Sequence, residues 1–124
     1  MKLLKIDWDK YEYFKQNEFL CPCCQKEEMN EATIDMLEKA REIAGVPFSI
    51  NSGFRCERRN EAVGGVKNSS HTVGFAVDIR CHDNKRRFLI VEALQKVGFT
   101  RIIIYPSFIH TDNLREKKIL LLGE

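Results

Sequence analysis

Residues 69–80 read Ser-Ser-His-Thr-Val-Gly-Phe-Ala-Val-Asp-Ile-Arg and form the centre of the predicted fold. From Gly74 onwards, bulky apolar residues alternate with small or polar ones, which is typical of a half-buried strand. The bulky residues on one face are Phe75, Val77 and Ile79. Asp78 lies on the other face. The pattern predicts a strand from Gly74 to Arg80 that packs its bulky face on the core and presents a carboxylate on the opposite side.

Two amphipathic segments on either side of this strand predict helices. Asn30 is a suitable N-cap for the first helix, which Gly45 ends, and Asp83 or Asn84 caps the second, which Gly98 ends. The predicted inward residues are Ile34, Leu37, Ala40, Ile43 and Ala44 in the first helix, and Phe88, Ile90, Val91, Leu94 and Val97 in the second. Both helices therefore offer an apolar side to the core.

Short apolar or β-branched runs predict the other strands, at residues 48–51, 101–105, 108–112 and 119–122. A helical turn is expected over residues 57–63. Helices and an antiparallel-leaning sheet alternate irregularly, which predicts an α+β class with a small, mostly antiparallel sheet and flanking helices.

The length of 124 residues predicts a single domain, with residues 1–20 as an N-terminal arm packed on the core and residues 21–124 as the main domain. Twenty basic and 18 acidic residues give a net charge of only +2, so nucleic-acid binding is not expected. No apolar run is long enough for a membrane span. Residues 1–8 lack a signal-peptide pattern, so we expect synthesis in the cytoplasm, with a monomer as the default state.

Five cysteines are present, and without a secretion signal free thiols are the default expectation. Cys21, Cys23 and Cys24 lie close together and contain a C-x-x-C pair, which is half of a zinc-binding pattern. No second C-x-x-C follows, although Cys56 and Cys81 could complete a site through the fold. Buried or half-buried free thiols and a cysteine metal site both remain open.

Two of the three histidines lie in segments that favour a ligand role. His71 enters the central strand, and His110 shares a face of a predicted strand with Asp112. Two imidazoles and a carboxylate are the protein ligands of an open catalytic zinc site. His71, Asp78 and His110 are therefore candidate ligands for one Zn²⁺, whereas His82 has no partner in the pattern and is expected on the surface.

Three segments resemble the zinc D-alanyl-D-alanine carboxypeptidases of peptidase family M15. Residues 69–78 are similar to the motif S-x-H-x-x-G-x-A-x-D, and residues 52–55 resemble S-G-[YF]-R. Residues 105–112 resemble the segment that carries the third ligand. The three segments follow one another in the same order and at similar separations as in the family, over roughly residues 18–115. Short phage and prophage members are the most similar in pattern.

The resemblance implies a fold shared with the signalling domain of Hedgehog, zinc bound by the two histidines and Asp78, and Arg55 as the holder of a substrate carboxylate. A guanidinium matches a carboxylate with two parallel hydrogen bonds. The family often has an acidic residue or histidine just before its third ligand, and residues 104–109 contain neither. Asp112 is then the nearest candidate for the catalytic base, or equally for a partner that orients a ligand histidine.

Two further side chains are candidate substrate contacts. Tyr105 can donate to a developing oxyanion or simply pack. Ser69 holds its loop, a ligand or the substrate, and it lacks the histidine and carboxylate that would make it a nucleophile.

The implied function is a zinc metallopeptidase that cuts stem or cross-link peptides of bacterial peptidoglycan and acts at the cell wall after release. One alternative is a catalytically silent, zinc-stabilised binding module of the same fold. Another is a cysteine-zinc interaction module centred on residues 21–24. The sequence leaves open whether the enzyme is a carboxypeptidase or an endopeptidase.

Overall fold

A computed structural model describes residues 5–114 and 118–123. One sheet contains β1 (Ser49–Ser52), β2 (Ala76–Arg80), β3 (Arg101–Ile104), β4 (Phe108–Asp112) and β5 (Ile119–Leu122), in the order β1-β2-β4-β3-β5. Neighbouring strands are antiparallel except for β3 and β5, which are parallel. The predicted α+β class with a mostly antiparallel sheet is confirmed.

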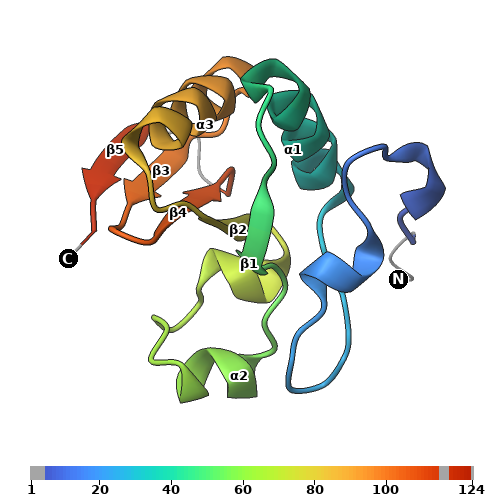
Figure 1. The fold of residues 1–124 in the computed structure, drawn as a ribbon. Coiled ribbons are helices and arrows are strands. Elements are labelled where there is room, and N and C mark those ends of the chain that lie inside the picture. The colour runs from blue at the N-terminus through green and yellow to red at the C-terminus, as the bar shows by residue number, and fades with distance from the viewer. Residues whose placement is uncertain (1–4, 115–117, 124) are drawn as a thin grey trace.

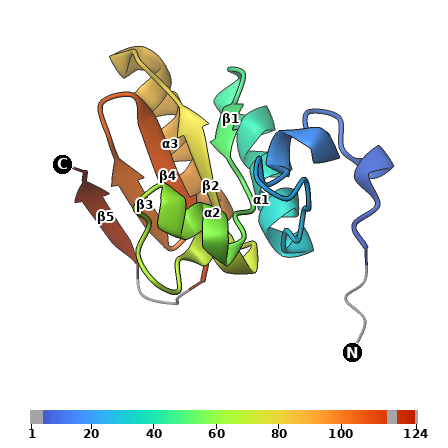
Figure 2. The same cartoon turned by 90° about the horizontal axis from the view of Figure 1, so that it is seen from below.

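Helices lie on both sides of this sheet. The long helices α1 (Glu31–Ala44) and α3 (Asn84–Val97) pack against each other on one side, and the short α2 (Glu57–Ala62) lies on the other (Figures 1 and 2). A 3-10 helix, η3 (Ser70–Val73), follows α2 and leads into β2. The side of the sheet away from α1 and α3 therefore carries the loops that surround Asp78.

The predicted helix boundaries are confirmed by the caps. The Asn30 side chain accepts a hydrogen bond from the Thr33 amide at the start of α1, and Gly45 ends the helix with a φ of 69°. Asp83 caps α3 in the same way, and Gly98 ends it with a φ of 101°. Glycine adopts this left-handed conformation without the steric cost of a Cβ atom.

The central strand begins two residues later than the sequence predicts. Gly74 has a φ of 80° and ends η3, so extended backbone pairing starts only at Ala76. The Gly74 carbonyl accepts a hydrogen bond from the Asn30 amide at 2.9 Å. A Cβ atom on Gly74 would overlap the carbonyl oxygen of Glu28, so this glycine allows η3 to pack closely against the start of α1.

The described part of the N-terminal segment contributes to the core. Phe14 and Phe19 are fully buried, and the Tyr11 hydroxyl donates to Asp35 in α1 at 2.6 Å. Residues 1–4 of the expected arm lie outside the described residues. The segment from residue 5 onwards therefore packs against α1 through both apolar and polar contacts.

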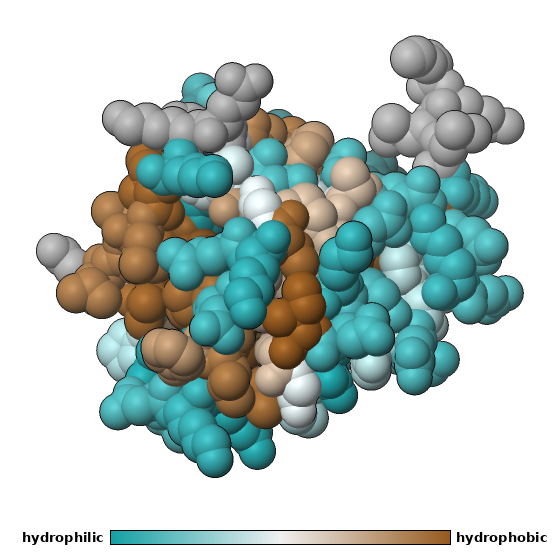
Figure 3. Space-filling model, turned by 90° about the horizontal axis from the view of Figure 1, so that it is seen from above, coloured by the Kyte–Doolittle hydropathy of each residue, from teal (hydrophilic) through white to brown (hydrophobic). Residues whose placement is uncertain are grey.

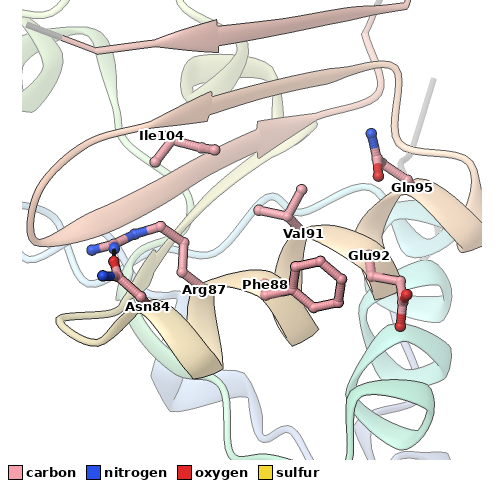
Figure 4. A pocket seen from close by; sticks show the side chains of 7 residues that line it. All are labelled: Asn84, Arg87, Phe88, Val91, Glu92, Gln95 and Ile104. Carbon is pink, nitrogen blue, oxygen red and sulfur yellow. Dashed lines mark hydrogen bonds between the residues drawn. The ribbon is translucent and has the colours of Figure 1, made fainter.

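Two predicted core residues are wrong. Ile43 of α1 is 45% exposed and Phe88 of α3 is 68% exposed. Ile43 lies beside the buried stripe of α1, whereas Phe88 points to nearly the opposite side of α3 from the buried Ile90. Phe88 and Val91 instead line a surface pocket that also contains Ile104 (Figure 4).

The β5 edge of the sheet is apolar on its surface. All four residues of β5 are exposed, and hydrophobic side chains gather on this side of the molecule (Figures 1 and 3). Among the described residues, no helix is both long and apolar enough to cross a bilayer.

Candidate metal centre

The backbone around η3 fixes the first candidate ligand, His71. The Ser69 hydroxyl accepts a hydrogen bond from the His71 amide at 3.2 Å, so it caps the 3-10 helix. The His71 carbonyl in turn accepts from the Arg55 amide at 3.2 Å. His71 is consequently buried, with 1% of its side chain exposed, and its backbone is tied to the segment that carries Arg55.

The sheet register brings the other two candidate ligands together. Asp78 of β2 pairs directly with His110 of β4, and on the outer side it pairs with Ser52 of β1. Side chains directly opposite each other on antiparallel strands share one face and lie about 5 Å apart at Cβ. Asp78 and His110 therefore project from the same side of the sheet, toward η3.

The three side chains converge on one oxygen atom. Asp78 Oδ1 lies 3.2 Å from His71 Nε2 and 3.0 Å from His110 Nδ1. One donor atom from each residue falls within 4.8 Å of the other two. The two imidazole rings lie edge to face, with their centroids 5.1 Å apart. The structure thus brings together all three of the ligands predicted from the sequence.

In each ring the nitrogen that does not contact Asp78, here called the outer nitrogen, shows which tautomer the imidazole adopts. His71 Nδ1 lies 2.8 Å from the carbonyl oxygen of Gly53, which can only accept a hydrogen bond, so Nδ1 carries a proton. His110 Nε2 lies 2.8 Å from Asp112 Oδ2, which likewise accepts. Each neutral imidazole then directs the lone pair of its inner nitrogen at the Asp78 carboxylate.

Two lone pairs and a carboxylate facing one another repel unless a cation lies between them. The nitrogen and oxygen donors are those that Zn²⁺ takes in catalytic sites, which have three protein ligands and one open position. Gly53 and Asp112 supply the hydrogen bonds that commonly orient zinc-bound histidines. The donor set therefore fits a zinc ion.

Without a cation, the repulsion is relieved only when the inner ring nitrogens take up protons. Burial opposes the charged form of Asp78, yet hydrogen bonds from such protonated rings of His110 and His71 hold the pKa of its carboxyl well below the usual range. Burial also works against the charged form of His110, but the carboxylates of Asp112 and Asp78 raise the pKa of its imidazole. Both carboxylates are thus kept ionised, which leaves negative charge for a cation.

Asp112 is almost fully buried beside His110. Its Oδ2 atom accepts from His110 Nε2 and also from the Ser70 hydroxyl at 3.2 Å. Burial works against its charge, whereas the hydrogen bond and charge of His110, with the nearby Arg101, lower the pKa of Asp112. This geometry favours an orienting role for Asp112 over that of a base.

A cavity of about 520 Å³ opens beside the cluster, and its wall includes His71, Asp78 and His110. The predicted substrate contacts Arg55, Ser69 and Tyr105 also line it. A peptide in this cavity would reach the metal-binding atoms and these side chains at the same time.

Arg55 has an unsatisfied donor at this cavity. Its Nε atom is buried and has no hydrogen-bond partner among the described residues. Burial lowers the pKa of its guanidinium, and the Asp78 carboxylate works in the opposite direction. A half-buried guanidinium with a free N–H is suited to an anionic ligand.

The other predicted residues occupy less specific positions. The Tyr105 ring stacks on Phe108 at 4.3 Å between centroids, so it packs as well as lining the cavity. The Ser69 hydroxyl is used by the His71 amide, which favours the loop-holding interpretation. His82 is exposed, as predicted, and accepts from Arg80 Nε at 3.2 Å.

The sequence analysis missed two groups at this site. The Gly53 carbonyl contacts His71 from a segment 18 residues earlier, and no side-chain pattern marks a backbone oxygen. Ser70 contacts Asp112 across 42 residues. Its place next to His71 in the central motif was a signal, but only the folded structure identifies its partner.

A buried and a half-buried histidine with one carboxylate, at the wall of a cavity in an α+β fold, form the kind of donor set found in metal-dependent hydrolases with an open coordination position. A family model described as Peptidase M15 matches residues 12–112 of the chain. The chain belongs to the peptidase M15 family, and it is a peptidase by that relationship. No curated protein matches the chain significantly.

Proposed function

We propose that this M15 peptidase binds one catalytic Zn²⁺ through His71, Asp78 and His110 and hydrolyses stem or cross-link peptides of bacterial peptidoglycan. The observation that carries the proposal is the convergence of His71 Nε2 and His110 Nδ1 on Asp78 Oδ1 beside a cavity. The family match supports the peptidase chemistry.

Zinc supplies Lewis acidity, which activates water near neutral pH and polarises a peptide carbonyl. The chain's own residues keep the ligands in place for this chemistry. The Gly53 carbonyl and the Asp112 carboxylate hold the outer nitrogens of the two histidines, so that the inner nitrogens stay unprotonated and directed inward.

Substrate binding falls to the other side chains of the cavity wall. Arg55 lines the cavity and offers its guanidinium charge to a peptide carboxylate, which peptidoglycan stem peptides carry. Tyr105 lies on the same wall and offers a hydroxyl to the carbonyl oxygen of the bond that is cut. In this arrangement Asp112 is a positioning residue, because its accepting oxygen is already used by His110 and Ser70.

One observation favours a second candidate, a zinc-stabilised binding module without catalytic activity. Residues 104–109 contain no carboxylate or histidine, and Asp112, the nearest acidic residue, is buried and hydrogen-bonded. Without a group that moves protons, turnover would be slow, because general acid–base catalysis contributes roughly 10²–10⁴-fold. The cavity and Arg55 would then serve binding alone.

Incubation of the zinc-loaded protein with purified cell-wall peptides separates the two candidates. The enzyme releases new amino groups or free D-alanine, and His71→Ala abolishes this release while the fold, followed by circular dichroism, is kept. Binding of the peptides without any cleavage would favour the binding module. The proposed substrate implies action at the bacterial cell wall after release, and a monomer is taken as the default state.

A further inference from the structure

Cysteines gather at a second place, next to Arg55 in the chain and separate from the candidate metal centre. Cys21, Cys23 and Cys24 belong to one tight turn, and Cys56 is the N-cap residue of α2. The Sγ atom of Cys56 lies 3.6 Å from that of Cys21 and 3.7 Å from that of Cys23. One sulfur from each of these three residues falls within 4.8 Å of the other two.

These separations match a shared metal ion better than a disulfide. A zinc–sulfur bond is about 2.3 Å long, and a tetrahedral site therefore places its sulfurs about 3.8 Å apart. A disulfide requires a sulfur–sulfur distance of about 2.05 Å. Residues 21 and 56 are 35 positions apart in the chain, so the close approach of their thiols is a product of the fold.

The backbone of the turn surrounds the sulfur of Cys21. The turn is closed by hydrogen bonds from the Gln25 amide to the Cys21 carbonyl and from the Cys21 amide to the Lys26 carbonyl, both 2.8 Å long. Cys21 itself is buried, and the closed turn fixes its sulfur 3.6 Å from that of Cys56.

Cys56 and Cys24 complete the surroundings of the cluster. The Arg59 amide donates to Cys56 Sγ at 3.4 Å. Cys24 is not in the group of three sulfurs that lie within 4.8 Å of one another. It belongs to the same turn and forms the C-x-x-C pair with Cys21, which makes it the candidate for the fourth ligand.

Cys81 is separate from this cluster. Its thiol is buried and donates to the Asp83 carbonyl at 3.5 Å, and it is not among the cysteines that approach one another in the described chain. Of the two residues that the sequence offered to complete a site, the fold uses Cys56. Cys81 is thus a matched control, a cysteine of the same chain with no role in the cluster.

We propose that Cys21, Cys23, Cys24 and Cys56 bind a structural Zn²⁺ ion that is distinct from the catalytic one. Four thiolates in a tetrahedral arrangement select zinc or an iron–sulfur centre, and the single-ion spacing favours zinc. The proposal does not depend on the peptidase activity.

An ion at this position would stabilise the fold by linking two segments of the chain. It would join the turn at residues 21–24 to the segment that runs from Gly53 to Cys56. That segment supplies the Gly53 carbonyl to His71 and presents Arg55 to the cavity. Its other ties are the hydrogen bonds from the Phe54 amide to Phe19 and from the Arg55 amide to His71.

The test measures the number of zinc ions bound per protein molecule. The protein is purified under reducing conditions with zinc and then dialysed against a weak chelator. The wild type and Cys81→Ser are expected to hold two equivalents of zinc. Cys56→Ser and the double variant Cys23→Ser/Cys24→Ser are expected to lose one, and His71→Ala is expected to lose the other. Cobalt-loaded wild type is expected to show thiolate-to-cobalt absorption, which the double variant lacks.

A measurement on the wild type alone tests the proposal even if the cysteine variants do not fold. A mercurial reagent that titrates thiols is expected to release one equivalent of zinc and leave the second bound. The proposal is overturned if the wild type and the cysteine variants hold equal metal, if no zinc is released by the mercurial, or if Cys21 and Cys56 are found in a disulfide.

Discussion

Replacement of Asp112 by asparagine tests how the buried carboxylate acts on the metal centre. Asp112 Oδ2 accepts from His110 Nε2 at 2.8 Å, and the two side chains are only 2% and 12% exposed. Asparagine keeps the size and one accepting oxygen, and the Ser70 hydroxyl can turn to suit it. The substitution therefore removes the negative charge with little change in packing.

The expected effect is a loss of zinc affinity. Removing a partner that orients a zinc-bound histidine weakens metal binding by about 10–100-fold, which corresponds to about 1.4–2.8 kcal/mol. The effect lies in this range because the pair is buried and poorly screened, whereas an exposed pair contributes less than about 1 kcal/mol. The hydrogen bond to His110 survives, so the zinc-saturated variant retains most of its turnover.

The assay is competition for Zn²⁺ with a chromophoric chelator, followed by turnover at saturating zinc. Asp9→Asn is the control, because Asp9 is an exposed acidic residue far from the site. Unchanged zinc affinity together with a fall in kcat of about 10²–10⁴ would refute the orienting role and identify Asp112 as the general base. No change in either quantity would contradict both roles.

Three further predictions follow from the same geometry. Gly74→Ala destabilises the protein by more than the roughly 1–3 kcal/mol of the left-handed backbone alone, because its Cβ overlaps the Glu28 carbonyl. Gly64→Ala, which has a similar φ but open space around it, is the matched control in denaturant unfolding; equal losses would contradict the packing argument. Arg55→Lys raises KM for peptides that end in a free carboxylate, with zinc content unchanged, because lysine lacks the guanidinium fork; an unchanged KM would remove Arg55 from substrate binding. In the metal-free protein, protonated His110 stabilises the fold at low pH, and this contribution is lost as pH rises through its raised pKa. Zinc must displace that proton, so the increase in Tm on adding zinc grows as the pH rises through this raised pKa; a constant increase would contradict the assignment.

Local sequence was sufficient for the helix ends, and for the position of the central strand but not for its start at Ala76. Asn30 and Asp83 have side chains that cap a helix, and Gly45 and Gly98 tolerate a positive φ, so each boundary depends on neighbouring residues alone. Phe88 was misplaced because the apolar residues of α3 lie on more than one face, and the fold buries the face with Ile90 and Leu94 rather than the face with Phe88.

The same distinction between local and long-range information holds at the metal centre. The identity of the three candidate ligands followed from short motifs. Their hydrogen-bond partners did not, because the Gly53 carbonyl meets His71 only after β1 and η3 have packed, and Ser70 meets Asp112 only in the register of β2 with β4. The choice of Cys56 over Cys81 in the cysteine cluster also depends on tertiary packing.

The most direct test of the catalytic zinc site is anomalous scattering at the zinc edge from crystals of the zinc-loaded protein. The predicted result is a peak within about 2.0–2.2 Å of His71 Nε2, His110 Nδ1 and an Asp78 oxygen, with Asp112 held on the far nitrogen of His110. Histidine rings turned away from Asp78, with no anomalous peak between them, would contradict the account.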